Sequence, residues 1–238
     1  GDSIFIPHAL ECQGNIIQMY DPIYHRKIEE TVDRQVAIAV EPKYDNRWFR
    51  SPRPFITSGG ELTLEMLDLT YSESSKIYEA PFQLKANNGI YLIDDFGRQR
   101  ATPAEVLNRW IVPMERSVDF LNFLTGGKMT VPFETFVVFS TNLRPEQLGD
   151  EAFLRRIQYK LLMRSPDRKE FVEIFEREIT RRRLNWNPQL LPELIEKRYK
   201  PEKRPFRRCH ARDLLNRAED LMAFERRDRV LTSEIVNN

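Results

Sequence analysis

The chain has 238 residues, with 37 Lys and Arg against 36 Asp and Glu, so its formal net charge is +1. Hydrophobic residues make up 41% and charged residues 31%, which supplies a core and excludes a disordered chain of low hydrophobicity. The apolar runs are far shorter than the roughly 18 residues that a membrane-spanning helix needs, and no secretory signal is visible. The only cysteines, Cys12 and Cys209, form no CxxC pair, which favours a reducing cytoplasm over a disulfide scaffold.

In chain order, the first segment that resembles regular structure is 4–40, which predicts a short strand, a helix and a second apolar run. Within the expected helix, His8 and Cys12 would share one face, but with Cys209 and the adjoining His210 they match no common zinc spacing. Two ordinary thiols are therefore the preferred interpretation.

Residues 41–60 are rich in Pro, Arg and Gly and predict a long loop that exposes three aromatic side chains, Tyr44, Trp48 and Phe49. A short helix is expected over 61–69, where Leu and Met recur at helical spacing.

Two continuous apolar runs then predict strands, at 89–95 and at 136–142. Neither run alternates polar and apolar residues, which suits parallel strands covered on both faces. A helical pattern interrupted at Pro113 lies between them over 103–124, and 157–163 is expected to form the next strand. The order strand, helix, strand predicts an α/β fold with a parallel sheet.

From residue 167 onward the pattern is helical, with apolar faces over 171–179, 190–195 and 214–222. A hinge is expected at 165–167, where Pro166 precedes Asp167. The sequence therefore predicts two domains, an α/β core over 1–165 and a small all-α domain over 166–238.

The charge is unevenly distributed along the chain. Residues 197–212 hold eight basic residues and one acid, for a net charge of +7. Such a segment can meet phosphate, and the interleaved Tyr199 and Phe206 leave nucleic-acid binding open as the minority interpretation. The preferred interpretation is a solvated loop, because Pro201 and Pro205 lie within it.

Polar side chains close both predicted strands of the sheet. Asp94 and Asp95 end the first run, and Asn142 ends the second. In an open α/β sheet, ligands bind beyond the carboxyl ends of the strands, and Mg²⁺ takes one or two carboxylates together with substrate phosphates. Asp94 can therefore anchor the water shell of Mg²⁺, and Asp95 and Asn142 can orient an attacking water. The alternative is that the two acids cap the next helix.

These strand ends are followed by Asp-Glu-Ala-Phe-Leu-Arg-Arg-Ile at 150–157 and by Cys-His-Ala-Arg-Asp-Leu-Leu at 209–215. The order of the four motifs resembles the AAA+ ATPase family, from about residue 86 to the end of the chain. The resemblance implies a P-loop NTPase-like parallel sheet followed by a helical lid. It also implies that ATP with Mg²⁺ is bound and hydrolysed in a ring of subunits, expected to be a hexamer.

The resemblance also implies a role for each motif residue. Asp94 would be the Walker B aspartate, holding Mg²⁺ through water, and Asp95 takes the place of the usual catalytic glutamate. Asn142 would be the first sensor. The remaining roles fall on three arginines: Arg155 or Arg156 as the finger that reaches a neighbouring subunit's nucleotide, and Arg212 as the second sensor in the lid.

Two departures from the family pattern stand out. Asp95 is one methylene shorter than glutamate, which predicts slower or altered hydrolysis. No G-x-x-x-x-G-K-[ST] motif occurs, and Gly126-Gly127-Lys128 lacks the required spacing and follows Walker B. The sequence is therefore expected to be a fragment without its first strand and P-loop, unable by itself to bind ATP tightly.

The leading interpretation is an AAA+ core that couples ATP hydrolysis to the remodelling of a protein or macromolecular partner, with the aromatic residues Tyr44, Trp48 and Phe49 as candidates for contacting a threaded polymer. One alternative is a module that keeps the architecture for protein interaction or assembly without hydrolysis. Another is a nucleic-acid-handling ATPase, based on 197–212.

Overall fold

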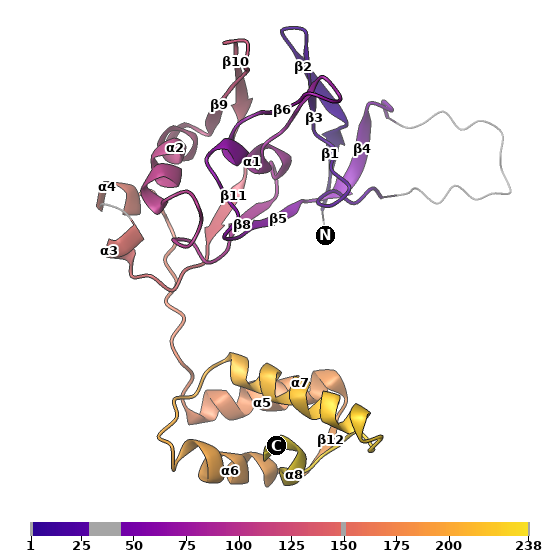
Figure 1. The fold of residues 1–238 in the computed structure, drawn as a ribbon, viewed down its shortest axis with the longest axis vertical. Helices are drawn as coiled ribbons and strands as arrows, with labels where there is room; N and C mark the ends of the chain where they lie inside the picture. The colour runs from indigo at the N-terminus through magenta and orange to yellow at the C-terminus, as the bar shows by residue number, and fades with distance from the viewer. Residues whose placement is uncertain (1, 29–43, 149–150, 238) are drawn as a thin grey trace, which may run out of the picture. The chain divides into compact units, whose positions relative to one another are not determined.

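The computed structural model describes residues 2–28, 44–148 and 151–237. The chain divides into two compact units, Gly1–Tyr159 and Lys160–Asn238 (Figure 1). The functional assignment of the predicted domains, 1–165 and 166–238, stays a prediction. Within the described ranges, no helix is both long and apolar enough to cross a membrane.

A parallel sheet of three strands lies at the centre of the first unit, in the order β11 (Phe136–Phe139), β8 (Ile90–Ile93), β5 (Phe55–Ser58). Its register aligns Ile90 with both Phe136 and Phe55. The two strands expected over 89–95 and 136–142 are therefore confirmed, as is their parallel pairing. The third strand, β5, lies where the sequence predicted a loop.

Two helices pack against the apolar core of this sheet, namely α1 (Phe82–Lys85) and α2 (Pro103–Arg116). Thr102 and Glu105 form a reciprocal capping box at the start of α2, and the buried residues of the helix are Val106, Leu107, Trp110 and Pro113. The helix passes through Pro113 and ends at Ser117, whose φ is 54°. The predicted helical pattern over 103–124 was thus wrong beyond residue 116.

Besides short helical segments, which include α3 (Pro145–Leu148) and α4 (Glu151–Leu154), the rest of the first unit consists of short antiparallel pairings and one mixed sheet. The strands of the mixed sheet run in the order β2 (Ala9–Cys12), β3 (Asn15–Gln18), β7 (Ile77–Glu79), β6 (Thr70–Ser72). Two further antiparallel pairs complete the unit, namely β1 (Ser3–Pro7) with β4 (Trp48–Pro52), and β9 (Val118–Asn122) with β10 (Lys128–Pro132).

Three predictions near the N-terminus need correction. The described part of 4–40 contains strands and no helix, so His8 and Cys12 share no helical face; 29–43 lie outside the described residues. The predicted loop over 41–60 contains β4 and β5, because long-range pairing with β1 and β8 overrides the Pro and Gly signals. The predicted helix over 61–69 is reduced to a single 3₁₀ turn, η1 (Glu65–Leu67).

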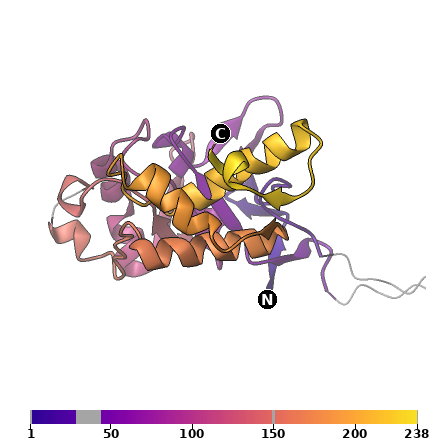
Figure 2. The ribbon, with the colours of Figure 1, turned by 90° about the horizontal axis from the view of Figure 1, so that it is seen from below.

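The second unit is helical, and its helices pack on one another around a shared apolar core (Figures 1 and 2). The three predicted helices are confirmed, and the first begins at Asp167, which forms a capping box with Glu170. The elements are α5 (Arg168–Arg182), β12 (Asn185–Trp186), α6 (Leu190–Leu194), the π-helix η2 (Ile195–Tyr199), α7 (Cys209–Phe224), β13 (Val230–Leu231) and α8 (Ser233–Asn237).

The strand expected over 157–163 does not form. Tyr159, Leu161, Leu162 and Met163 are 73 to 88% exposed and belong to no strand. A strand exists only when a neighbour satisfies its backbone groups. Among the described strands, β11 pairs with β8 on one side and with no strand on the other.

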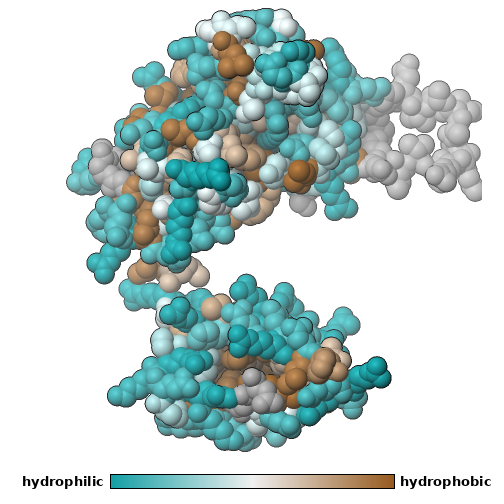
Figure 3. Space-filling view, viewed as in Figure 1, coloured by the Kyte–Doolittle hydropathy of each residue, from teal (hydrophilic) through white to brown (hydrophobic). Residues whose placement is uncertain are grey.

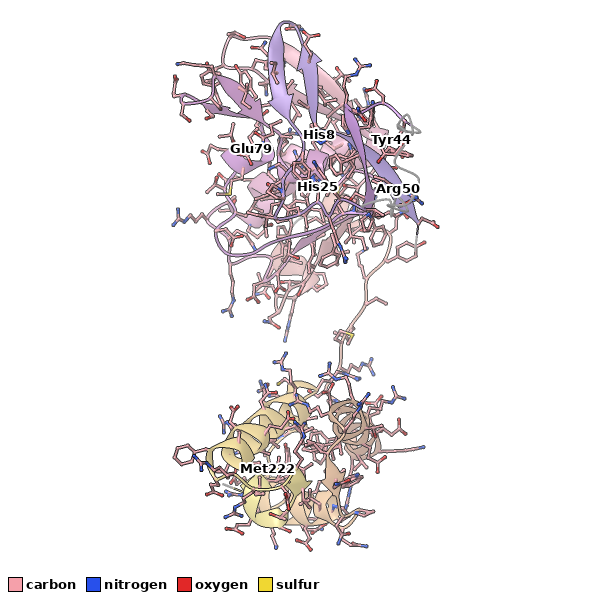
Figure 4. All side chains as sticks on the ribbon, turned by 90° about the vertical axis from the view of Figure 1, so that its right-hand side faces the viewer. His8, His25, Tyr44, Arg50, Glu79 and Met222 are labelled. Atoms are coloured by element: carbon pink, nitrogen blue, oxygen red, sulfur yellow. The ribbon has the colours of Figure 1, made fainter. Side chains whose placement is uncertain are left out.

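A buried polar cluster joins the segment after β3 to α1. His25 is 2% exposed, and its ring centroid lies 5.9 Å from that of Phe49. His8, which is labelled with His25 in Figure 4, lies 5.0 Å from the same ring. The Asp21 N–H donates to His25 Nδ1 over 3.1 Å, so the neutral ring carries its proton on Nε2 and donates to the Lys85 carbonyl over 2.9 Å. Lys85 Nζ in turn lies 2.8 Å from an Asp21 carboxylate oxygen.

This geometry predicts a loss of stability on acidification. Burial lowers the pKa of His25 below its ordinary value of 6.5. The stability that the neutral ring contributes is therefore complete above pH 6.5 and is lost as the pH falls below it, with a slope of at most about 1.4 kcal/mol per pH unit. Urea unfolding from pH 7.5 to pH 5 should show a shallower pH dependence in His25→Gln than in the wild type. Equal slopes would contradict this.

Candidate functional site

The carboxyl ends of β5, β8 and β11 lie at one edge of the parallel sheet. The Asp94 N–H donates to the Ser58 carbonyl over 2.8 Å, and the Ser140 N–H donates to the Ile93 carbonyl over 3.0 Å. These bonds continue the strand pairing by one residue on each side of β8. The structure thereby brings the turn that carries Asp94 and Asp95 beside the loop that carries Asn142.

Phe96 binds these two loops to each other. Its N–H donates to the Ser140 carbonyl over 2.7 Å, and its carbonyl accepts the Thr141 hydroxyl over 2.6 Å. The same hydroxyl oxygen accepts the Leu143 N–H over 3.0 Å. The Phe96 ring is 1% exposed and lies 4.7 Å from the Phe139 ring. The turn that carries Asp94 and Asp95 can therefore shift only together with the loop that carries Asn142.

The turn after β8 has a backbone that restricts its sequence. Asp95 has a φ of 50° and Gly97 a φ of 104°. A Cβ at Gly97 would lie within 2.3 Å of the Leu143 side chain, so only glycine fits there. Gln99 braces the turn, because its amide donates to the Asp94 carbonyl over 2.8 Å and accepts the Gly97 N–H over 2.7 Å.

The candidate chemical groups at this edge point to solvent. Asp94, Asp95 and Asn142 are all exposed, so the cost of burying a carboxylate, which supported the sequence interpretation, does not apply here. The two acids do not cap a helix either, because the next helix begins nine residues after Asp94 and is capped by Thr102. One Asp94 carboxylate oxygen accepts the Asp95 N–H over 3.1 Å, and the exposed carboxylates can accept further bonds from water or a hydrated cation.

Sequence reasoning missed two polar residues at the end of β5. The Ser58 hydroxyl lies 2.8 Å from the buried Tyr91 hydroxyl. Glu61 accepts the Gly59 N–H over 2.9 Å, and this hydrogen bond lowers the pKa of its carboxyl. The signal for the end of β5 is the sequence Ser-Gly-Gly-Glu at 58–61, which follows a short apolar run. This run lies in the segment 41–60, for which the Pro, Arg and Gly content predicts a loop.

The structure separates the two candidate finger arginines. Arg156 forms an ion pair with Glu115 at the end of α2, at 2.5 Å, and its side chain is 25% exposed. Arg155 pairs locally with Glu151, one turn earlier, and its side chain is 74% exposed. Arg156 therefore serves to fix its own segment, and Arg155 is the arginine that can reach outward.

Arg212 belongs to the second unit, in the first turn of α7 (Cys209–Phe224). Its side chain is 65% exposed and its Nε lies 3.1 Å from a carboxylate oxygen of the adjacent Asp213. The sequence expectation for Arg212 as a nucleotide contact stays a prediction.

The three aromatic residues predicted to lie on one loop have different environments. Phe49 lies in β4 and is 4% exposed, so it cannot contact a partner; this part of the prediction was wrong. Trp48 is 43% exposed, and Tyr44 lies 4.8 Å from the Phe5 ring. A role for Trp48 and Tyr44 in contacting a substrate stays a prediction.

The described residues contain no group of three or more His, Cys, Asp or Glu side chains that could hold a metal ion by themselves. Cys12 and Cys209 are free and belong to different units. Any cation at the sheet edge would therefore need ligands in addition to the protein carboxylates, such as water and phosphate oxygens.

The parallel sheet with its edge of polar groups, together with the helical C-terminal unit, defines a mixed α/β fold that resembles AAA+ P-loop NTPases. A crystal structure of NtrX from Brucella abortus matches 76% of this chain and 42% of its own chain, at 16% identity with a TM-score of 0.52. NtrX from the same organism in complex with ADP matches the same shares at 18% identity and a TM-score of 0.49.

A RuvB mutant from Thermotoga maritima matches 77% of this chain and 51% of its own chain, at 15% identity and a TM-score of 0.48. The chain thus spans about half or less of the length of these proteins, and at such identities the similarity shows the fold alone. A family model described as a domain of unknown function (DUF8689) matches residues 167–238. No curated protein matches the chain.

Thr141 offers a test of the bond network at the sheet edge. Thr141→Val keeps the branched shape but removes the hydroxyl that serves Phe96 and Leu143, so it should lower the free energy of unfolding by about 1–3 kcal/mol. Thr141→Ser, which keeps the hydroxyl, is the matched control and should lose less. Urea denaturation measures both; equal losses would show that the hydroxyl does not hold the loops together.

Proposed function

We propose that this chain is part of an AAA+ ATPase in which the edge formed by Asp94, Asp95 and Asn142 acts on the terminal phosphate of ATP. The observation that supports the proposal is the parallel register of β8 with β5 and β11, which collects the three side chains at one sheet edge. The resemblance of the fold to NtrX supports the same class of protein. The hydrolysis would serve to remodel a protein or macromolecular partner.

The donor set at this edge fits magnesium. Mg²⁺ prefers oxygen ligands, keeps several waters, and in phosphate-transfer sites uses one or two carboxylates with the substrate phosphates. Asp94, exposed on the turn after β8, would hold the hydrated ion. The ion would neutralise charge on the phosphates.

The remaining groups would act on the attacking water. Asp95 would accept a hydrogen bond from it, and Asn142 would orient it by its amide. Phe96 connects the loops of these two residues through one main-chain hydrogen bond to Ser140 and one from the Thr141 hydroxyl, so their separation does not depend on side-chain packing alone. Asp95 is shorter than a glutamate at this position, and we expect slower hydrolysis than a glutamate would give.

We further propose that Arg155 is supplied to the site of a neighbouring subunit in a ring, taken as a hexamer, while Arg156 fixes the segment that carries it. The exposure of Arg155 and the anchoring of Arg156 to Glu115 support this division. Arg212 would contact the nucleotide from the helical unit. The reaction also requires a phosphate-binding loop, which these 238 residues do not contain.

A second candidate is an interaction or assembly module that does not hydrolyse ATP. The observation that favours it is the aspartate at position 95, which is one methylene shorter than the usual catalytic glutamate. The two candidates differ in one measurable property, the turnover of ATP by the longest natural chain.

The first test is ATP hydrolysis by that longest natural chain with Asp94→Asn. Loss of the charge that holds Mg²⁺ should reduce turnover by about 100-fold or more, since metal stabilisation is worth several kcal/mol. Glu73→Gln, the same chemical change on an exposed turn, is the control and should leave turnover unchanged. Equal turnover in all three proteins would refute the proposed site, and no turnover in the wild type would favour the interaction module.

The second test is subunit mixing. Arg155→Ala and Asp94→Asn proteins should each be inactive alone, with the arginine loss costing about 1,000-fold. Mixed oligomers should regain part of the activity, because some interfaces then combine an intact Asp94 with an intact Arg155. Absence of any recovery in demonstrably mixed rings would contradict a finger acting between subunits. Recovery with Arg156→Ala in place of Arg155→Ala would reverse the assignment.

A further inference from the structure

A groove lies between η1 (Glu65–Leu67), the first half of α2 and the end of β9. Its volume is about 640 Å³, and all of its lining belongs to the first unit. The apolar part of the lining consists of Leu64, Leu69, Phe123 and Leu124. Figure 3 shows hydrophobic surface at the end of this unit that carries β9 and β10, with hydrophilic surface beside it.

The floor of the groove is apolar, and one of its rims leaves a leucine in water. Leu69 and Phe123 are buried and belong to one apolar cluster with Tyr78. Leu124 is 75% exposed, yet its backbone is held in place, because its N–H donates to the Tyr78 hydroxyl over 3.2 Å. A bound apolar side chain would cover Leu124 and the floor together, which removes apolar surface from water.

Hydrogen bonds hold the three sides of the groove together. Arg109 of α2 donates to the Phe120 carbonyl of β9 over 3.2 Å and to the Leu67 carbonyl of η1 over 3.3 Å. Asp68 accepts the main-chain N–H and the side-chain amide of Asn122, each over 2.9 Å. A partner would therefore meet a groove that is already formed, which limits the entropy lost on binding.

The lining of the groove is acidic. Its charged side chains are three acids, Glu65, Asp68 and Glu105, and one base, Arg109. The Arg109 guanidinium faces inward, because it lies 2.6 Å from a carboxylate oxygen of Asp119, which is 1% exposed and lies outside the lining. The charge of this arginine is therefore matched by Asp119 rather than by the acids of the groove.

Two of the acids, on different elements, are close enough for their charges to interact. Glu65 belongs to η1, and Glu105 lies in the first turn of α2. Hydrogen bonds from Thr102 lower the pKa of Glu105, whereas the charge of Glu65 works in the opposite direction. The pKa of Glu65 is lowered by a hydrogen bond from Thr63. Both carboxylates are ionised at neutral pH, and a cation beside them would relieve their repulsion.

This combination of surfaces selects the chemistry of a partner. The groove is large enough for several side chains, and protein interfaces combine an apolar centre with charges that complement those of the partner. Lys and Arg side chains form charge-assisted hydrogen bonds with carboxylates. We propose that this groove binds a basic segment of a partner protein, with an apolar side chain over Leu69 and Phe123 and flanking Lys or Arg side chains at Glu65 and Glu105.

Nucleic acid does not fit the groove, because carboxylates repel its phosphates. The basic segment 197–212 gives nucleic-acid binding little support either. Tyr199 in that segment is 5% exposed, and its ring stacks on the Phe206 ring at 5.0 Å. The Tyr199 ring is therefore not available to stack on bases, which single-stranded nucleic acid would require.

The charge of the groove can be tested by fluorescence anisotropy with the full chain and a labelled peptide, Lys-Arg-Leu-Phe-Arg-Lys. Glu65→Gln together with Glu105→Gln should weaken binding about tenfold, through the loss of two exposed charge pairs. Glutamine at position 105 can still form the capping box, so α2 is retained. Glu73→Gln with Glu134→Gln removes the same charge at exposed positions outside the lining and should weaken binding by about twofold or less.

The apolar part of the groove can be tested in the same assay with Leu124→Ser. Because Leu124 is largely exposed, serine should leave the fold intact, and the lost apolar contact should weaken binding about tenfold. Leu161→Ser is the matched control, since Leu161 is 88% exposed and lies outside the lining. It should bind the peptide as the wild type does.

Several results would overturn the proposal. Equal weakening by the groove pair and the control pair of glutamate changes would indicate nonspecific attraction. Equal binding by Leu124→Ser and Leu161→Ser would show that the apolar surface is not used. Absence of saturable binding to the wild type, or tighter binding of an oligonucleotide of the same length, would contradict the assigned partner.

Sedimentation of the same proteins separates a partner protein from a second copy of this chain. The wild type and the variant with Glu65→Gln and Glu105→Gln should have the same oligomeric state. Dissociation of an oligomer by these changes would show that a second copy fills the groove and would overturn the proposal. The groove does not include Asp94, Asp95 or Asn142, so none of these results depends on whether the chain hydrolyses ATP.

Discussion

The structure depends on the parallel pairing of β8 with a strand on each side. Main-chain bonds from Asp94 to Ser58 and from Ser140 to Ile93 extend that pairing beyond the last strand residues. The carboxyl ends of parallel strands lie at the same edge of a sheet. Asp95 and Asn142, which are 47 positions apart in the chain, therefore lie at one edge. An antiparallel β11 would have placed Asn142 at the opposite end of the sheet and left the two aspartates without it.

β11 ends the described parallel sheet on one side, and apolar side chains of this strand and of a later segment are exposed. Phe136 is 58% exposed, and the run from Tyr159 to Met163 has the composition of a strand without forming one. An edge strand presents unpaired backbone groups and readily accepts another strand.

Arginine is abundant in this chain, and its environment decides what each arginine does. Arg156 and Arg155 are adjacent in sequence, yet one is fixed to α2 and the other is exposed. The same division occurs in the second unit, where Arg208 lies 3.7 Å from Glu170 of α5, while Arg212 pairs locally with the adjacent Asp213. Net charge alone would treat all four as equivalent, because it contains no information on distance.

Local pattern determined the helices of the second unit and the two strands that end in Asp94 and Asn142, because continuous apolar runs and helical spacing reflect interactions between near neighbours in the chain. The order of those strand ends also suggested the AAA+ resemblance. Only tertiary structure decided that β4 and β5 form within 48–58 and that Phe49 and Tyr199 are buried. It also decided that Ser58 and Thr141 form hydrogen bonds at the carboxyl edge of the parallel sheet. Each of these outcomes depends on pairing or packing between residues distant in sequence, which propensity does not encode.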